Sequence, residues 1–217
     1  MLLLGIDTSA AISVGVVRDD QVLAAISRHE PRRHAELLAP LVAEAIEAAG
    51  IDRTELDGIA VGVGPGPFTG LRIGLVTAQT MGYALNIPVY GLPSMDALAL
   101  AARDAQISDE LVTICDARRG EVYWARYAPG ATTPSGGPDV EKLTELGLSG
   151  AITIGRMAPN LPEVAGANLL DPQAVNLARL VAQRLAAGQK EFPTQPLYLR
   201  RPHVQMAEQR KRATPQH

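Results

Sequence analysis

The part of the sequence that most constrains the fold is residues 59–86, which read IAVGVGPGPFTGLRIGLVTAQTMGYALN. Residues 59–63 are mainly apolar and predict a buried strand. A loop rich in glycine and proline follows, and a helical pattern begins at about Thr69. A strand joined to a helix by one short loop is a basic unit of α/β proteins. We therefore expect a sheet with helices packed on it.

The loop at residues 64–70 does not match the common phosphate-binding motifs. It lacks the Gly-Lys-Ser/Thr ending of a P-loop, and its glycines miss the spacing of a dinucleotide fingerprint. Pro65 and Pro67 also remove two backbone donors. Arg72 places a cation near the start of the helix, where it opposes the helix dipole. We therefore expect a compensating anion beside Arg72, either a carboxylate of the same chain or a group on a ligand or partner.

The helix after this loop carries a stripe of small residues. Glycine costs about 1 kcal/mol relative to alanine inside a helix, so repeated glycines on one face predict that another backbone approaches closely. That backbone belongs either to the chain's own sheet or to another subunit. We take the subunit as the hypothesis and add two positions of the preceding helix. The predicted partner interface contains Gly70, Gly74, Ala78, Gly82, His34 and Leu38.

A strand, polar turn and strand pattern occurs once in each half of the chain. Residues 2–27 predict a meander of three strands, and residues 111–127 repeat its opening, with Asp116 at the position that Asp7 holds in the first half. This repetition suggests a duplicated α/β architecture. Carboxylates and hydroxyls at such turns can hold magnesium or phosphate, although they are also ordinary turn formers. The candidate nucleotide site, taken as vestigial, contains Asp7, Thr8, Ser9, Asp116 and Arg118.

The remaining elements are predicted from the spacing of apolar residues and from the residue types that begin or end helices and strands. Apolar residues on one face predict a helix over residues 33–49, and Ser94 is a candidate cap for a helix that ends near residue 105. Arg118 and Glu121 are candidates either for an ion pair across the turn of the second half or for side chains that face the cleft between the halves. The other expected elements are strands at 87–90 and 151–154, a loop at 129–138, and helices at 139–146 and 171–187.

Composition describes a globular chain with unevenly distributed charge. The 217 residues carry a net charge of −3, while residues 200–217 contain five Lys/Arg and one acidic residue. The basic end is expected to be a flexible tail, and the acidic remainder is not that of a protein built to hold nucleic acid unaided. The opening apolar run is too short to cross a bilayer and lacks a basic signal-peptide front, so we expect a cytoplasmic protein without membrane contact.

Neither a zinc site nor a reactive thiol is expected. His29 and His34 lie five residues apart with Pro31 between them, so a helix cannot present both to one metal ion. A metalloprotease therefore has no residue support. Cys115 is the one cysteine of the chain and lies in an apolar run, which favours a structural thiol.

Four segments together resemble the TsaB (YeaZ) family. They read LGIDTSAAISVGVV, GVGPGPFTGLRIGL, DARRGEVY and PLYLR. The resemblance covers nearly the whole chain and implies an actin-like fold of the sugar kinase and Hsp70 type, with RNase H-like halves and a truncated second lobe. We accordingly expect an N-terminal lobe at 1–105, a smaller lobe at 106–200 whose helix at 172–187 can pack back on the first, and a tail at 201–217. The family signature loop corresponds to Gly64, Gly66, Phe68, Thr69 and Arg72.

The resemblance also implies a role in tRNA modification. Family members are noncatalytic subunits that pair with TsaD, which, together with the ATPase TsaE, transfers a threonylcarbamoyl group to N6 of adenosine 37 in tRNAs reading codons that start with A. It implies a homodimer when the chain is alone, tRNA contact mainly through the partner, and no cofactor apart from ATP or ADP with magnesium in the complex. The alternative hypothesis is a nucleotide-dependent phosphotransferase of the same fold, with Asp7 holding magnesium.

Overall fold

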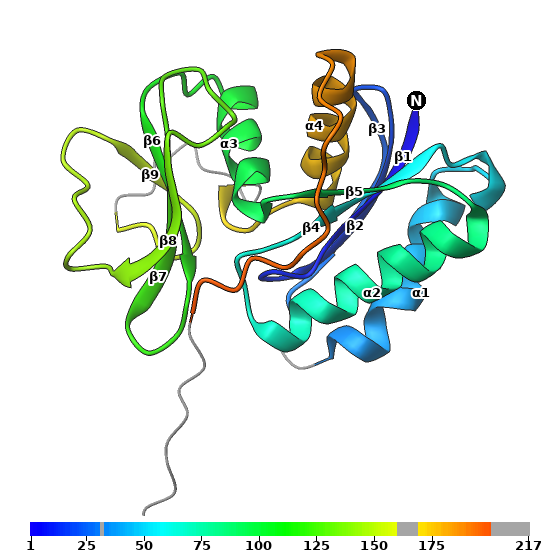
Figure 1. Cartoon of the computed structure of the whole chain (residues 1–217), viewed down its shortest axis with the longest axis horizontal. Coiled ribbons are helices and arrows are strands. Elements are labelled where there is room, and N and C mark those ends of the chain that lie inside the picture. The colour runs from blue at the N-terminus through cyan, green and yellow to red at the C-terminus, as the bar shows by residue number, and fades with distance from the viewer. Residues whose placement is uncertain (31–32, 160–168, 201–217) are drawn as a thin grey trace, which may run out of the picture.

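The computed structural model describes residues 1–30, 33–159 and 169–200, which form two lobes side by side (Figure 1). The first lobe has a five-stranded sheet covered by helices on both faces, and the second has a smaller four-stranded sheet. This is the duplicated α/β, actin-like architecture with a reduced second lobe that the sequence predicted.

The first sheet combines an antiparallel meander with two parallel strands. Its order is β3-β2-β1-β4-β5, with β1 antiparallel to β2, and β4 parallel to both β1 and β5. Its strands are β1 (Leu2–Asp7), β2 (Ile12–Arg18), β3 (Gln21–Arg28), β4 (Gly58–Gly62) and β5 (Val89–Leu92). Every residue of β1 and β4 is buried, as expected for central strands covered on both faces.

Helices α1 (His34–Ala48) and α2 (Phe68–Leu85) cover one face of this sheet, and α4 (Ala174–Ala186) covers the other (Figure 1). Successive side chains of β1 point to opposite faces of the sheet, so this strand contributes to the hydrophobic core on each face. Leu4 and Ile6 pack in the cluster that holds the buried residues of α1 and α2, whereas Leu3 packs with those of α4. The sheet is therefore the shared wall of two hydrophobic cores.

The small-residue stripe of α2 lies against the chain's own strands, which corrects its assignment to a partner interface. All four stripe residues are buried. A Cβ atom at Gly74 would lie 2.3 Å from Thr8 Oγ1, and one at Gly82 would lie 2.4 Å from a methyl carbon of Val89. Leu38 is also 1% exposed, in the core beneath α1. The close approach inferred from the glycines is thus real, but it is intramolecular.

The second lobe corrects one expected element. Its strands, in the order β8-β7-β6-β9, are β6 (Leu111–Asp116), β7 (Glu121–Tyr127), β8 (Gly136–Lys142) and β9 (Ile152–Ile154). Residues 139–146, expected as a helix, begin instead within β8, which pairs antiparallel with β7. Strand pairing overrides the local periodicity here. The expected loop at 129–138 likewise ends inside this strand.

Helix α4 belongs structurally to the first lobe although it follows the second in sequence. Its first turn lies on Gly5, where a Cβ atom would stand 2.2 Å from the carbonyl oxygen of Ala174. Only glycine at this position of β1 allows the helix to lie so close to the sheet. The first lobe thus comprises the opening residues and α4, rather than the opening residues alone.

Buried and half-buried polar contacts join α4 to α3 (Ser94–Asp104) and to the second lobe. Arg184 of α4 and the fully buried Tyr127 of β7 donate hydrogen bonds to opposite oxygens of Asp96, at 2.8 and 2.9 Å. The expected Ser94 cap is absent, since Ser94 Oγ instead accepts a bond from the Gly64 amide. Because Asp96 is buried and satisfied on both oxygens, this triad fixes the two lobes relative to each other.

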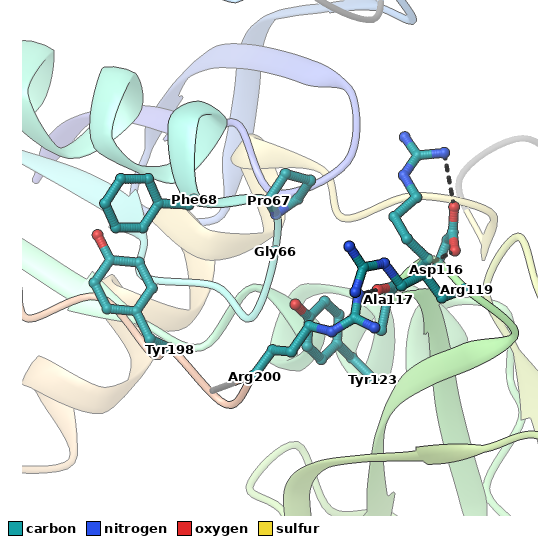
Figure 2. Close-up of a pocket in the computed structure, with 10 residues that line it drawn as sticks. Gly66, Pro67, Phe68, Asp116, Ala117, Arg119, Tyr123, Tyr198 and Arg200 are labelled. Atoms are coloured by element: carbon teal, nitrogen blue, oxygen red, sulfur yellow. Dashed lines mark hydrogen bonds and ion pairs between the residues drawn. The ribbon is translucent and has the colours of Figure 1, made fainter. Parts of the chain in front are cut away.

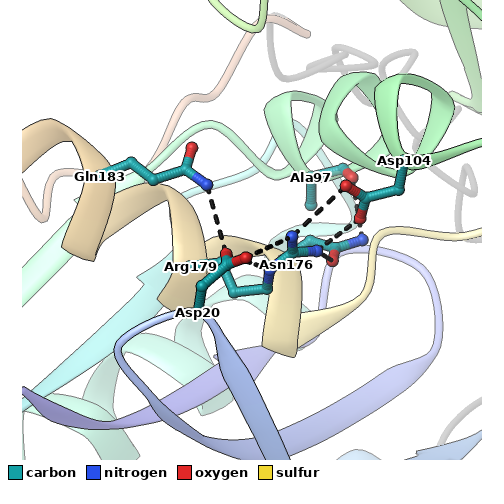
Figure 3. Close-up of polar contacts among 6 residues, drawn as sticks. All are labelled: Asp20, Ala97, Asp104, Asn176, Arg179 and Gln183. Carbon is teal, nitrogen blue, oxygen red and sulfur yellow. Dashed lines mark hydrogen bonds and ion pairs between the residues drawn. The ribbon is translucent and has the colours of Figure 1, made fainter. Parts of the chain in front are cut away.

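A second arginine of α4 holds three elements together on the surface. The Arg179 side chain is 15% exposed and pairs with Asp20, in the turn after β2, and with Asp104 at the end of α3 (Figure 3). Gln183 and Asn176 complete the cluster. Paired hydrogen bonds to two carboxylates give the guanidinium group of Arg179 a defined orientation.

The contact at Gly5 makes a prediction about stability. Gly5→Ala should lower the free energy of unfolding by about 1–3 kcal/mol, because its methyl group overlaps backbone atoms of Ala174 that cannot move without lifting α4. Gly147→Ala is the matched control, since a Cβ there meets nothing within 4 Å. Urea unfolding of both variants measures the difference. Equal stabilities would contradict the assigned packing of α4.

Candidate functional site

The turn after β1 is closed in this structure. The side chains of Asp7, Thr8 and Ser9 are 1%, 1% and 6% exposed. The backbone amide and hydroxyl of Ser9 both donate to Asp7 Oδ1, at 2.9 and 2.7 Å. Thr8 Oγ1 donates to the carbonyl oxygen of Gly70 at 2.8 Å, which ties the turn to the first residues of α2. These hydrogen bonds use the groups that were expected to meet a ligand.

The signature loop covers this turn. A Cβ atom at Gly66 would lie 2.7 Å from the carbonyl oxygen of Ser9, and one at Gly70 would lie 2.7 Å from that of Thr8. The Gly64–Pro65 peptide bond is cis. Gly64 and Gly66 are buried, while Thr69 is exposed on the first turn of α2. The loop's glycines therefore serve close packing on the turn, not an amide cradle for phosphate.

Burial makes the Asp7 carboxyl a weaker acid than an ordinary aspartate side chain. Desolvation raises its pKa to about 6, against the opposing effect of its hydrogen bonds from Ser9. Its Oδ2 atom, pressed against Gly62, is one of the buried side-chain atoms without a hydrogen bond among the described residues. This carboxyl therefore lowers the stability of the fold when it is ionised, because a buried charge without full compensation is destabilising.

A cavity of about 740 Å³ lies between the lobes. Figure 2 shows its walls: the signature loop and the start of α2 on one side, the turn after β6 on the other, and the segment containing Tyr198 and Arg200 across one end. We call it the inter-lobe cleft. Its lining residues are Gly66, Pro67, Phe68, Asp116, Ala117, Arg118, Arg119, Tyr123, Tyr198 and Arg200.

The cleft divides the candidate nucleotide site in two. Asp116 and Arg118 line it, whereas Asp7, Thr8 and Ser9 do not. The duplication places Asp7 and Asp116 equivalently, each as the last residue of the first strand of its lobe. The packing of the signature loop, which cannot be seen in the strand pattern, closes one turn and leaves the other open.

Arg72 has an aromatic neighbour where an anion was expected. Its guanidinium carbon lies 3.7 Å from the centre of the Phe68 ring, and its Nε donates to Tyr198 Oη at 3.1 Å. The Phe68 and Tyr198 rings lie 5.0 Å apart with a tilt of 32°. A cation over a ring face is an electrostatically favourable contact. Within the described ranges Arg72 forms no ion pair, so neither expected anion is needed to hold it.

Arginines gather on the other side of the cleft. Arg118 pairs with Asp116 at 3.0 Å and Arg200 with Glu121 at 2.7 Å, so Arg118 and Glu121 do not pair with each other. Of the two alternatives for Arg118, the structure shows the side chain that faces the cleft. Arg200 also donates to the carbonyl oxygen of Ala117 at 2.9 Å. Sequence analysis missed four cleft residues, all within the DARRGEVY and PLYLR segments on which the family resemblance rests: Arg119, Tyr123, Tyr198 and Arg200.

A second surface feature lies on the outside of α1 and α2. A groove of about 550 Å³ is lined by α1, by the segment that follows it and by Met81 of α2, and most of its lining residues, such as Val42 and Ile46, are apolar. On α2, Phe68, Val76 and Tyr83 are 52%, 58% and 91% exposed, although large and hydrophobic. We call Val76 and Tyr83 together with the groove the outer α1–α2 face, since Phe68 lines the inter-lobe cleft. His34 begins α1, half-buried, and burial lowers its pKa.

Two other kinds of site, a reactive thiol and a metal centre, have less support. Cys115 is half-buried, and desolvation raises the pKa of its thiol to about 12, far from that of a nucleophile at neutral pH. Among the described residues, no three His, Cys, Asp or Glu side chains cluster in a way that could hold a metal ion. The same part of the chain contains no helix with the length and apolar character needed to cross a bilayer.

Comparison with known proteins identifies the relatives of this chain. Residues 22–192 match the family model described as TsaD, tRNA N6-adenosine threonylcarbamoyltransferase. An uncharacterized protein of Mycobacterium tuberculosis is 41% identical over 202 residues, covering 92% of both chains. The tRNA threonylcarbamoyladenosine biosynthesis protein TsaB of Escherichia coli is 30% identical over 220 residues, covering 92% of this chain and 95% of that protein.

Solved structures agree with these sequence matches. The structure of YeaZ from Pseudomonas aeruginosa is 30% identical and superimposes with a TM-score of 0.75, covering 91% of this chain and 99% of that one. A further Pseudomonas aeruginosa structure, described as similar to peptidase YeaZ, gives a TM-score of 0.77 at 30% identity. Both lobes are therefore shared with these structures at nearly full length.

The buried Asp7 carboxyl predicts how stability depends on pH. Because the folded state raises its pKa from 3.8 to about 6, its contribution to stability is complete at low pH and is lost as the pH rises through that interval. Asp7→Asn removes this loss, while its amide oxygen can still accept both bonds from Ser9. The stability of the variant relative to the natural protein should increase by about 2 kcal/mol between pH 4 and pH 8.

Urea unfolding at the two pH values measures this difference. Asp109→Asn, at an exposed position, is the control and should leave stability unchanged at both. A difference between Asp7→Asn and the natural protein that stays constant with pH would show that this carboxyl ionises freely in the folded state.

Proposed function

The chain belongs to the TsaB (YeaZ) family, and from this premise we propose that it is a noncatalytic, partner-binding subunit in the biosynthesis of threonylcarbamoyladenosine in tRNA. Its partner in this proposal is a TsaD protein, which carries out transfer of the threonylcarbamoyl group to N6 of adenosine. The observation that carries the partner-binding role is the outer α1–α2 face, which holds both an apolar groove and two exposed hydrophobic side chains of α2, Val76 and Tyr83.

The closed turn after β1 supports a noncatalytic role. A phosphotransferase of this architecture would need Asp7 open to magnesium and phosphate. Here Asp7 is 1% exposed, its turn is hydrogen-bonded to itself and to Gly70, and the signature loop packs over it. Opening the site would require breaking these contacts. The phosphotransferase hypothesis is therefore the weaker of the two.

The outer α1–α2 face has the character of a protein interface. Val76 and Tyr83 lie seven positions apart on α2, two turns of helix, and so project from the same side. Exposed aromatic and aliphatic side chains are typical of surfaces that bind a partner. Since the glycine stripe holds α2 against the sheet, the exposed side of the helix is presented on a rigid support. A helix of a partner would fit between α1 and α2 by ridge-into-groove packing.

The remaining parts of the proposal concern the assembly. The same face would support a homodimer when the chain is alone and a heterodimer when TsaD is present, so the two states would compete. TsaE, and ATP or ADP with magnesium, would join only in the complex, and most of the tRNA contact would come from the partner. A net charge of −3 is consistent with this division.

Charged substitutions on the outer face test the proposal. Val76→Asp should weaken association with TsaD by at least about tenfold, because it buries an unpaired carboxylate in the interface. Val22→Asp is the matched control, since Val22 is 43% exposed and lies on β3, at the edge of the sheet. Tyr83→Ala should also weaken association, through loss of aromatic contact area.

Sizing of the mixed proteins, followed by titration calorimetry, measures these affinities, and tRNA threonylcarbamoylation with all components gives a second readout. Equal effects of Val76→Asp and Val22→Asp would place the interface elsewhere. A natural chain that neither associates with TsaD nor supports the modification would refute the proposed function itself.

A further inference from the structure

Residues 188–200, which we call the C-terminal strap, carry the chain from the end of α4 to the second lobe (Figure 1). Two backbone hydrogen bonds hold the strap on the first lobe. The Gly91 amide donates to the carbonyl oxygen of Phe192 at 3.2 Å, and the Leu197 amide donates to that of Val63 at 2.8 Å. A Cβ atom at Gly91 would lie 2.1 Å from a further carbonyl oxygen of the strap. The strap therefore follows a path that close backbone contacts define.

The strap ends on the turn after β6. Leu199 packs against the core of the second lobe. Arg200 pairs with Glu121 at 2.7 Å and donates to the carbonyl oxygen of Ala117 at 2.9 Å. Because residue 201 is covalently bound to Arg200, the remaining chain has to start at this turn. The strap thus fixes the place from which residues 201–217 extend.

The same turn presents two arginines to solvent. The Arg118 side chain is 69% exposed and pairs with Asp116. Arg119 is also exposed, and within residues 1–30, 33–159 and 169–200 it makes no hydrogen bond or ion pair. Their φ angles are 66° and 58°, in the left-handed region that asparagine and glycine adopt at lower cost. A strained backbone that carries two exposed cations points to a use for those cations.

Residues 201–217, expected as a basic tail, lie outside the described residues, but their composition is informative. They contain four Lys/Arg, one acidic residue and no Phe, Tyr or Trp, in a chain whose remainder carries net negative charge. Such a segment offers cations and little apolar surface, so its contacts with a partner are expected to be electrostatic. A segment of this length reaches at most about 60 Å from Arg200.

The fold therefore brings two sets of cations from distant parts of the sequence to one place. Arg118 and Arg119 follow β6, whereas residues 201–217 follow the strap, and the contact of Arg200 with Ala117 joins the two. Repeated phosphates along a nucleic acid backbone are the partner chemistry that suits several separate Lys and Arg side chains. Concentrating them at one end also limits repulsion between the phosphates and the acidic remainder of the chain.

We propose that Arg118, Arg119 and residues 201–217, together named the basic corner, bind the phosphate backbone of an RNA. The choice of RNA rests on the proposed function in tRNA modification, whereas the gathering of cations does not. The contact is made with phosphates at the surface and needs neither the inter-lobe cleft nor a metal ion. It supplies this chain's own, smaller share of the RNA contact and is independent of base sequence.

Neutralising the tail in the full-length chain tests the proposal. Fluorescence anisotropy with labelled tRNA and with a single-stranded RNA measures affinity at several salt concentrations. The tail variant carries Arg201→Gln, Arg210→Gln, Lys211→Gln and Arg212→Gln. The control has the same net charge and neutralises four exposed cations elsewhere: Arg18→Gln, Arg28→Gln, Lys142→Gln and Lys190→Gln. Two of the control cations form ion pairs, both at the surface, where such pairs contribute little to stability.

The tail variant should bind RNA at least about tenfold more weakly than the natural chain, whereas the control should change affinity much less. The slope of log affinity against log salt should fall by about 0.7 for each single-strand phosphate contact that is lost. In the modification reaction reconstituted with TsaD, the tail variant should raise KM for tRNA and leave kcat unchanged.

The strained turn provides a separate readout. Arg119→Asn should weaken RNA binding about threefold, because it removes one phosphate contact. It should leave the free energy of unfolding unchanged or raise it, because asparagine adopts the left-handed region more readily than arginine. Urea unfolding measures the second effect. Lower affinity without lower stability is the result expected of a ligand contact and not of a structural residue.

Three results would overturn the proposal. One is the absence of RNA binding by the natural chain at low salt, and another is an equal loss of affinity in the tail variant and its control, which would indicate attraction by overall charge. The third is unchanged RNA affinity with weaker association with TsaD, which would assign the tail to an acidic protein surface. If the chain does not associate with TsaD but the tail variant still loses RNA affinity, the proposed function fails and the basic corner stands.

Discussion

The contact between the start of α2 and the turn after β1 is the constraint on which the rest of the molecule depends. Thr8 donates to the carbonyl oxygen of Gly70, and side chains at Gly66, Gly70 or Gly74 would overlap the atoms of this turn. The contact closes the turn after β1, and it places the signature loop at the edge of the inter-lobe cleft. It also turns the opposite side of α2, with Val76 and Tyr83, outward.

The placement of the second lobe depends on α4. This helix packs on β1 through Gly5 and is joined through Arg184 to Asp96, which also accepts a hydrogen bond from Tyr127 of the second lobe. A buried carboxylate that is bonded from two lobes resists their separation, because opening would leave it unpaired. The cleft is therefore a defined space between fixed walls. Its arginines and aromatic rings come from three separate parts of the chain that this packing brings together.

Two positions keep residues that the local structure does not favour. Asp7 carries a carboxyl in a site that raises its pKa to about 6, and Arg119 carries a long side chain on a left-handed backbone. Natural sequences depart from local consistency mainly where function or inheritance requires it. For Asp7 the neighbouring turn is closed by hydrogen bonds from Ser9. For Arg119 the side chain is exposed at the wall of the inter-lobe cleft.

The sequence by itself determined the α/β class, most strand and helix positions, the two-lobed repetition and the family, because these depend on periodicity and on motifs that are local in the chain. It also established that some backbone must approach Gly70, Gly74 and Gly82 closely. Only the tertiary structure decided which backbone that is, because the glycines specify a short distance and not the identity of the neighbour. In the same way, residues 139–146 have a helical pattern, but pairing with β7 draws their first residues into a strand. The partners of Arg72 and Arg200 were likewise decided by long-range packing, since a charge carries no information about which distant group it will meet.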